Sequence, residues 1–156
     1  MREYHREPKE FEEKVIQINR VSKKTKGGNK IGFTALVVIG DKKGRVGVAL
    51  GKANDVLSAI KKGARLAKRG LIKVPLSGTT IPHKTTVKFR AAKIMLKPAP
   101  PGTGIIAGGS IRAVVETAGI QNIVSKILGC NNKITNVYAT FKALKSFKKG
   151  VKDGTK

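Results

Sequence analysis

The chain has 156 residues, and its 33 lysines and arginines against 9 acidic residues give a formal net charge of +24. A chain of this length forms one domain or two small ones, and 40% hydrophobic content with clear strand and helix periodicity argues against a disordered basic protein. No apolar run approaches the ~18 residues of a membrane span, and the charged N-terminus is not typical of a signal peptide.

The charge is distributed unevenly. Five of the nine acidic residues lie in the first thirteen positions, so the remainder of the chain is strongly basic. A compact body with that imbalance repels itself, and a polyanion relieves the repulsion. Nucleic acid is the leading candidate, because basic side chains displace its condensed counterions. An anionic membrane surface is the main rival, and we expect no membrane partner.

The first half of the chain predicts a small sheet. Residues 1–13 mix charges without an apolar face and predict a mobile tail, whereas 15–21 suits a strand. Residues 21–31, VSKKTKGGNKI, predict a long, flexible and basic loop. An apolar run at 33–39, a glycine-bounded turn at 40–44 and period-two apolar positions at 45–51 complete a three-stranded antiparallel meander.

A helix is predicted after this meander, with Asn54 or Asp55 as its N-cap. Its apolar stripe would cover one face of the sheet and consists of Val56, Ile60, Ala64, Ala67 and Leu71. Its opposite side carries Lys61, Lys62, Arg65, Lys68 and Arg69. From the helix alone, two interpretations of that side have equal weight: a solvated face and an RNA-facing stripe.

Prolines and Gly78 mark a boundary at 72–83, and two strand-like pieces follow it. Their apolar phase changes face near Ala91–Ala92, which predicts a turn or bulge there, because a continuous strand cannot change faces. Residues 97–104, KPAPPGTG, are typical of a rigid linker.

Three helical segments are predicted after the linker: 110–118 capped by Ser110, then 121–128, then a segment capped by Thr135 or Asn136. The last segment bears Val137, Phe141, Leu144 and Lys148 on one side. The chain is therefore predicted to be α+β, with modules at 15–74 and 75–149 and a flexible tail at 150–156. Each module is near the lower size limit for an independent core, so we expect them to depend on mutual docking or on a partner.

The segment PGTGIIAGGS, 101–110, resembles a dinucleotide-binding fingerprint. Its spacing, Gly102-x-Gly104-x-x-x-Gly108, is one residue too long, and no acidic residue follows about 20 positions on. A tight strand-to-helix turn at Gly108 and Gly109 is the better interpretation. The free amides of such a turn could still meet an RNA phosphate or a partner protein.

No catalytic constellation is found. Glu116 is mid-helix with no second carboxylate nearby in sequence to form an acid/base pair. Cys130 forms no internal disulfide, and only His83 could serve as its base, so a free structural thiol is the better interpretation. One cysteine and two distant histidines give no metal-ligand spacing, and we expect no metal, no cofactor and no enzymatic activity.

The basic loop and the basic helix face could together form one RNA-binding surface. Double-stranded RNA is read mainly through shape, phosphates and 2′-hydroxyls, which lysines, glycines and Asn29 suit. An aromatic content of 4% argues against a platform for stacking single strands, and Phe33 is better interpreted as a core residue.

Three long segments resemble one known family. They are NRVSKKTKGGNKIGFTALVVIGDKKGRVGVALGKA at 19–53, then VPLSGTTIPHK, then PAPPGTGIIAGGSIRAVVETAGIQNI. In this order they resemble the bacterial and organellar small-subunit ribosomal proteins of family five, over about residues 14–146. The resemblance implies a first domain similar to double-stranded-RNA-binding domains without their opening helix. It also implies a second αβ domain with a left-handed βαβ crossover.

The same resemblance implies a structural role, as a monomer within a cytoplasmic or organellar ribosome. It places the chain near the neck of the small subunit and the channel through which mRNA enters, against rRNA and small-subunit proteins four and eight. The family's rRNA-contacting loop matches Arg20, Val21, Ser22, Lys23, Lys24, Lys26, Gly27, Gly28, Asn29 and Lys30. Arg45, Lys52 and the five basic helix residues complete the predicted rRNA-binding set.

The glycine segment matches a region that faces protein four and is linked to decoding accuracy. Its predicted interface residues are Gly102, Gly104, Gly108, Gly109 and Arg112. Val87 and Ala91 stand where the family has glycines, and Asn29 stands where it often has arginine. The alternatives from other classes are a free-standing double-stranded-RNA-binding regulator and a small nucleotide-binding enzyme.

Overall fold

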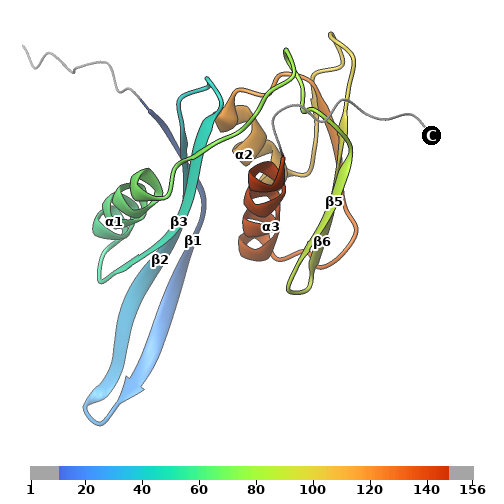
Figure 1. The fold of residues 1–156 in the computed structure, drawn as a ribbon. Coiled ribbons are helices and arrows are strands. Elements are labelled where there is room, and N and C mark those ends of the chain that lie inside the picture. The colour runs from blue at the N-terminus through green and yellow to red at the C-terminus, as the bar shows by residue number, and fades with distance from the viewer. Residues whose placement is uncertain (1–10, 148–156) are drawn as a thin grey trace, which may run out of the picture.

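A computed structural model describes residues 11–147 and shows an α+β protein with two four-stranded sheets (Figure 1). The first sheet is antiparallel, in the order β1 (Glu12–Thr25), β2 (Gly28–Gly40), β3 (Arg45–Ala53) and β4 (Ile72–Lys73). The second has the order β5 (Thr85–Phe89), β6 (Ala92–Pro98), β8 (Ile123–Ile127) and β7 (Ile105–Ile106). The helices are α1 (Val56–Arg69), α2 (Gly109–Ala118) and α3 (Lys133–Ser146). None of these helices is long and apolar enough to span a membrane.

Helix α1 covers one face of the first sheet, as predicted. Asp55 caps it by accepting a hydrogen bond from the Ser58 backbone N–H. The helix packs unusually close to β3, because β3 places glycines beneath it: a Cβ at Gly51 would lie 2.1 Å from the Ala59 carbonyl oxygen. The buried contact is made by Ala35, Val37, Ile39, Ala49, Ala59, Ala64 and Ala67.

The opposite face of the first sheet shares a core with the second sheet. Leu36 and Val48 belong to the same buried cluster as Ile94, Val114 and Leu144. In Figure 1, α2 and α3 lie between the two sheets. The expected mutual docking is therefore observed as one continuous apolar core.

Backbone contacts reinforce this docking at the turn between β2 and β3. The Lys42 N–H donates to the Thr117 carbonyl at 3.2 Å, and the Gly44 N–H donates to the Ala118 carbonyl at 2.9 Å. Gly119 lies so close that a Cβ there would be 2.1 Å from the Lys42 carbonyl oxygen. The end of α2 is thus fixed to the first sheet without space for a side chain.

Two predictions for the first half were wrong. The tail was predicted to extend to residue 13, but β1 begins at Glu12, because Phe11 lies beneath the Arg45 guanidinium and Glu12 pairs with Lys42. The predicted flexible loop at 21–31 is instead regular strand apart from a two-residue turn. Beyond the predicted meander, the short strand β4 joins the edge of β3.

In the second half, the turn near Ala91–Ala92 is confirmed as a tight hairpin between β5 and β6, with Arg90 at a left-handed φ of 53°. The helix predicted at 121–128 is wrong, since this segment forms β8. Its β-branched residues alternate between the core and the outer face, and Gly119 and Gly129 leave it too short for a stable helix.

Helix α3 is capped by Asn132 rather than by Thr135 or Asn136, because the Asn132 side chain accepts a hydrogen bond from the Ile134 N–H. The predicted residue Lys148 and the predicted tail at 150–156 lie outside the described residues. The expected βαβ crossover is the connection from β7 through α2 to β8, which is parallel to β7. Its left hand stays a prediction.

Asp41 fixes the turn between β2 and β3. Its carboxylate accepts hydrogen bonds from the backbone N–H groups of Lys43 and Arg45 and from the Arg45 Nε at 2.6 Å. Burial alone would raise the pKa of the Asp41 carboxyl, but the hydrogen bonds from Arg45 and Lys43 outweigh it and lower that pKa.

We therefore predict that Asp41→Asn destabilises the protein at neutral pH by about 1–3 kcal/mol, measured by urea unfolding. Because the folded-state pKa is lowered, this stabilisation is complete above the ordinary carboxyl pKa and is lost as pH falls through the folded value. The variant should thus show a shallower loss of stability in acid. Asp55→Asn is the control, since asparagine caps a helix as well as aspartate does. Equal stability of the two variants at neutral pH would contradict the prediction.

Candidate nucleic-acid interface

A two-stranded ribbon, formed by the ends of β1 and β2, protrudes from the described part of the molecule (Figure 1). Strand β3 pairs with β2 only from Phe33 onward, so residues 21–32 have no third strand beside them. Every residue from 21 to 31 is exposed, and the ribbon extends well past α1 in Figure 1. Its turn is Lys26–Gly27, closed by the Thr25 hydroxyl donating to the Gly28 carbonyl at 2.7 Å.

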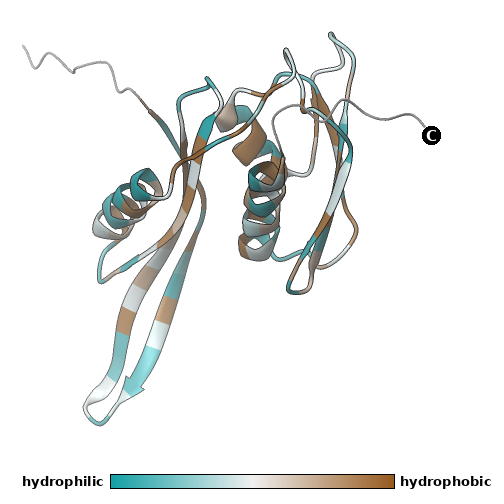
Figure 2. Cartoon of the chain, viewed as in Figure 1, coloured by the Kyte–Doolittle hydropathy of each residue, from teal (hydrophilic) through white to brown (hydrophobic). Residues whose placement is uncertain are grey.

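The pairing register distributes the ribbon's cations over both faces. Arg20, Ser22 and Lys24 alternate along one face, with Asn29 opposite Lys24. Lys23 lies directly opposite Lys30 on the other face. Like charges in such a pair repel, so the free ribbon carries a cost that an anion would remove. Figure 2 shows the outer part of the ribbon mostly in hydrophilic colours, interrupted by isolated hydrophobic positions.

The ribbon was predicted as a loop because neither of its faces is buried. A strand is recognised by apolar residues on alternate positions, and residues 22–30 contain none. The available signal was the Gly27–Gly28 pair, which favours a tight two-residue hairpin turn. Gly28 has a φ of 124°, a conformation that side-chain-bearing residues rarely adopt.

The basic side of α1 lies on the same side of the first sheet as Arg20 and Lys24. The helix begins near Gly51, at the base of the ribbon, and ends near Gly47. Three of its predicted residues, Lys61, Lys62 and Arg65, border a shallow hollow of about 360 Å³ with Ser58. Lys68 and Arg69 lie at the far end.

Some of the predicted residues are engaged within the protein. The Lys68 Nζ lies 3.6 Å from a Glu13 carboxylate oxygen, and Arg45 pairs with Asp41. Lys52, opposite Thr34, is exposed on the face that carries Lys23 and Lys30. The structure thus brings Lys52 to the ribbon but ties Arg45 into a turn.

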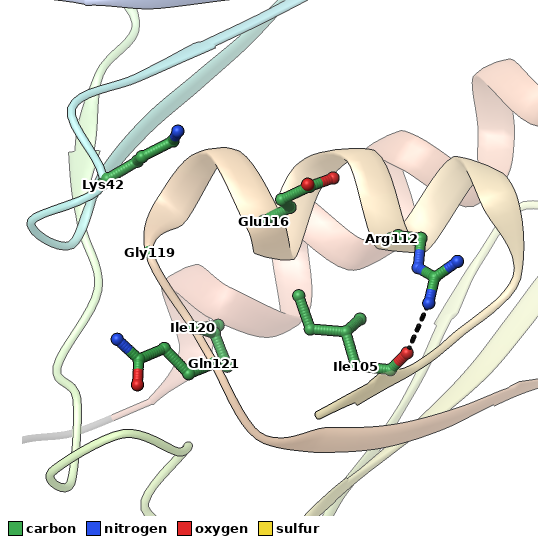
Figure 3. Close-up of a pocket in the computed structure, with 7 residues that line it drawn as sticks. All are labelled: Lys42, Ile105, Arg112, Glu116, Gly119, Ile120 and Gln121. Carbon is green, nitrogen blue, oxygen red and sulfur yellow. Dashed lines mark hydrogen bonds between the residues drawn. The ribbon is translucent and has the colours of Figure 1, made fainter. Parts of the chain in front are cut away.

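Ile105 of the glycine segment lines a separate hollow of about 700 Å³ (Figure 3), whereas Gly108 and Gly109 line another hollow of about 430 Å³. Arg112 lines the larger hollow and donates from Nη2 to the Ile105 carbonyl at 2.9 Å. Gly102 and Gly104 have left-handed φ values of 91° and 72°. Helix α2 begins at Gly109, and Gly108 directly precedes it. This agrees with the interpretation of the segment as a tight turn into a helix.

Sequence reasoning did not assign the two other charged residues of the hollow beside Arg112, Lys42 and Glu116, to an interface. Glu116 accepts a hydrogen bond from Lys14 at 2.6 Å. That bond and the Lys14 charge lower the pKa of Glu116, with Arg112 and Lys42 adding to the effect. The hydrogen bond to Glu12 raises the pKa of Lys42. Lys42 and Glu116 are more than 70 positions apart, and no local sequence pattern indicates that they lie close together.

The residues considered for catalysis are not brought together into a site. His83 lies edge-on to Phe147 with ring centroids 5.1 Å apart, and within residues 11–147 no hydrogen bond joins it to Cys130. The Cys130 sulfur lies 3.3 Å from the Thr135 hydroxyl, and hydrogen bonds from Thr135 and the Asn132 backbone lower the thiol pKa. The same part of the chain contains no His/Cys/Asp/Glu cluster able to hold a metal ion.

A compact α+β body with a protruding cationic ribbon defines an RNA-binding structural protein. Residues 11–75 match the family "Ribosomal protein S5, N-terminal domain", and residues 87–151 match "Ribosomal protein S5, C-terminal domain". The small ribosomal subunit protein uS5 of Chloroflexus aurantiacus is 57% identical over 135 residues, 86% of this chain and 76% of that protein. The uS5 of Protochlamydia amoebophila is 52% identical over 132 residues, 85% of this chain and 79% of its own.

The chain therefore belongs to the ribosomal protein S5 family. It is a structural, non-enzymatic constituent of the small ribosomal subunit, and the resemblance seen in the sequence is confirmed. The nucleotide-binding enzyme is thereby set aside.

The ribbon should be the least stable regular element of the free protein, because a two-stranded hairpin without a third strand is marginal in water. We predict fast amide hydrogen exchange at residues 22–31 and slow exchange at residues 35–39 of the same strand pair. The β5–β6 hairpin, which α3 covers, is the internal control and should exchange slowly. Equal protection of residues 22–31 and 35–39 would contradict a free ribbon.

Proposed function

We propose that the ribbon and the adjacent side of α1 bind rRNA at the neck of the small subunit, near the channel through which mRNA enters. The observation that carries this proposal is the exposed segment from Arg20 to Lys30, which holds five basic residues and no acidic one. Phosphates would neutralise these cations, and the small turn at Gly27 would let RNA approach the backbone.

Binding would also stabilise the ribbon. The repulsion between Lys23 and Lys30 disappears when a phosphate lies between them. Cations on both faces allow the ribbon to insert between RNA segments rather than lie on one of them. Near the mRNA channel, the same basic side chains could hold separated strands without nucleotide hydrolysis.

We further propose that the hollow beside Arg112 faces small-subunit protein four, and that this interface supports translational accuracy. The mixed charge of Arg112, Glu116 and Lys42 around an apolar Ile105 suits a protein surface that must separate and rejoin. Small-subunit protein eight is proposed as a second neighbour from the family resemblance alone.

The ribbon's role is tested by replacing Lys23, Lys24 and Lys26 together with alanine. Log affinity for a small-subunit rRNA transcript should fall less steeply with log salt, by roughly 0.7–0.9 for each phosphate that the variant no longer neutralises. The matched control removes the exposed Lys133, Lys142 and Lys145 of α3, an equal charge. A slope unchanged in the ribbon variant, or reduced equally in both, would remove the ribbon from the interface.

The protein-four interface is tested with Arg112→Ala. The variant loses the hydrogen bond to Ile105 and the cation beside Glu116, so affinity for purified protein four should fall about tenfold. A weaker interface opens more readily, so misreading in cell-free translation should rise. Lys142→Ala, on the exposed side of α3, is the control. Unaltered affinity with unaltered misreading would contradict this assignment.

A further inference from the structure

The outer face of the second sheet carries a cluster of four lysines. Lys88 of β5, Lys93 and Lys97 of β6, and Lys126 of β8 are all exposed, and we refer to them as the lysine face. Their neighbours in sequence, such as Ile94 and Leu96, point inward to the shared core. In Figure 1, α2 and α3 lie on the inner side of this sheet, and none of the described helices covers its outer side.

The register places these lysines next to one another. Lys88 lies directly opposite Lys93, and Met95 lies opposite Lys126. Because Lys97 is paired with Val124, Lys126 is the diagonal neighbour of both Lys93 and Lys97, at about 7–8 Å. Four cations therefore occupy adjoining positions over three strands.

Nothing in the described chain balances this charge. The acidic residues within 11–147 are Glu12, Glu13, Asp41, Asp55 and Glu116, and all lie outside the second sheet. The ion pairs among these residues do not include any member of the lysine face. Lys88 lies opposite Lys93 as Lys23 lies opposite Lys30 on the ribbon. The repulsion between the two lysines of each pair destabilises the free protein.

Apolar side chains lie among the lysines on the same outer face. Val124 is half-buried, and Ile106, its partner on β7, is 53% exposed. Such a face offers cations for phosphates and apolar surface for the sugars between them. A protein partner would need a strongly acidic surface to match four lysines, whereas an RNA backbone presents that charge everywhere.

We propose that the lysine face binds the phosphate backbone of an rRNA segment different from the one at the ribbon. The inference rests on the proposed rRNA binding of this chain and adds a second, separate surface to it. The ribbon and the lysine face lie on opposite sides of the shared core, with α2 and α3 between them (Figure 1). The chain thus joins two RNA segments through its rigid middle.

The first experiment replaces Lys93, Lys97 and Lys126 with alanine in the full chain and measures binding to a small-subunit rRNA transcript against salt. The slope of log affinity against log salt concentration should become shallower by about 2–3 units, because three lysines no longer neutralise phosphates. The control variant lacks Lys133, Lys142 and Lys145 and should keep the slope. An equally shallow slope in both variants would mean that only the net charge of the protein matters, and would overturn the proposal. A wild-type slope in the face variant, alongside a reduced slope in the ribbon variant, would overturn it while leaving the proposed function intact.

A second variant separates folding from binding. Lys93→Glu places a carboxylate between Lys88 and Lys126, so the melting temperature of the free protein should rise while affinity for the transcript falls. A rise in melting temperature with unchanged affinity would show a merely solvated face and overturn the proposal.

The last measurement needs no variant. Acetylation of lysines by an amine-reactive reagent should be suppressed at Lys93, Lys97 and Lys126 when the wild-type chain is bound to the naked transcript, with Lys142 as the reference. Suppression that occurs only in the complete subunit would mean that a protein covers this face, and would overturn the proposal.

Discussion

The structure depends on one large apolar core that two small sheets share, beside the smaller cluster beneath α1. Neither sheet covers its own inner face. Leu36 and Val48 of the first sheet are buried only because α2 and α3 lie against them, and the same helices bury Ile94 and Leu96 of the second. A protein with this net charge has few polar contacts of opposite sign to add stability, so non-directional burial must supply most of it. With both inner faces buried together, the basic side chains are left outside.

This arrangement explains where glycine is required. Gly51 allows α1 to approach β3, and Gly119 allows the end of α2 to meet the backbone of Lys42. Both positions exclude even a methyl group, because the opposing atoms belong to the backbone and cannot turn away. The few acidic residues act at similar joints: Glu12 and Glu116 pair with Lys42 and Lys14, and Asp41 fixes the turn. Scarce negative charge is thus used to hold the elements together.

Much of the fold could be predicted from local patterns. Period-two apolar positions located β3, and the cap at Asp55 located α1. The segment that became β8 could not be assigned in the same way, because Ile123 and Ile127 fit a helical stripe as well as a strand. Its partners, Ile94 and Ile105, are distant in sequence. For the candidate site, the sequence predicted a set of basic residues but not their geometry, since an exposed ribbon has no buried face to reveal its period.

The ribbon and the core differ in what their order depends on. Val37 and Val38, in the middle of β2, are fully buried on opposite faces, so both faces of the sheet hold that strand in place. Six residues earlier in the same strand, Ile31 is 40% exposed and has a neighbour on one side only. A rigid base with a marginal extension is suited to a surface that takes its final shape on RNA, because the ordering cost is confined to about ten residues and the base keeps the ribbon's direction. In the proposed rRNA contact, the charges that destabilise the ribbon in isolation would become the contacts that order it.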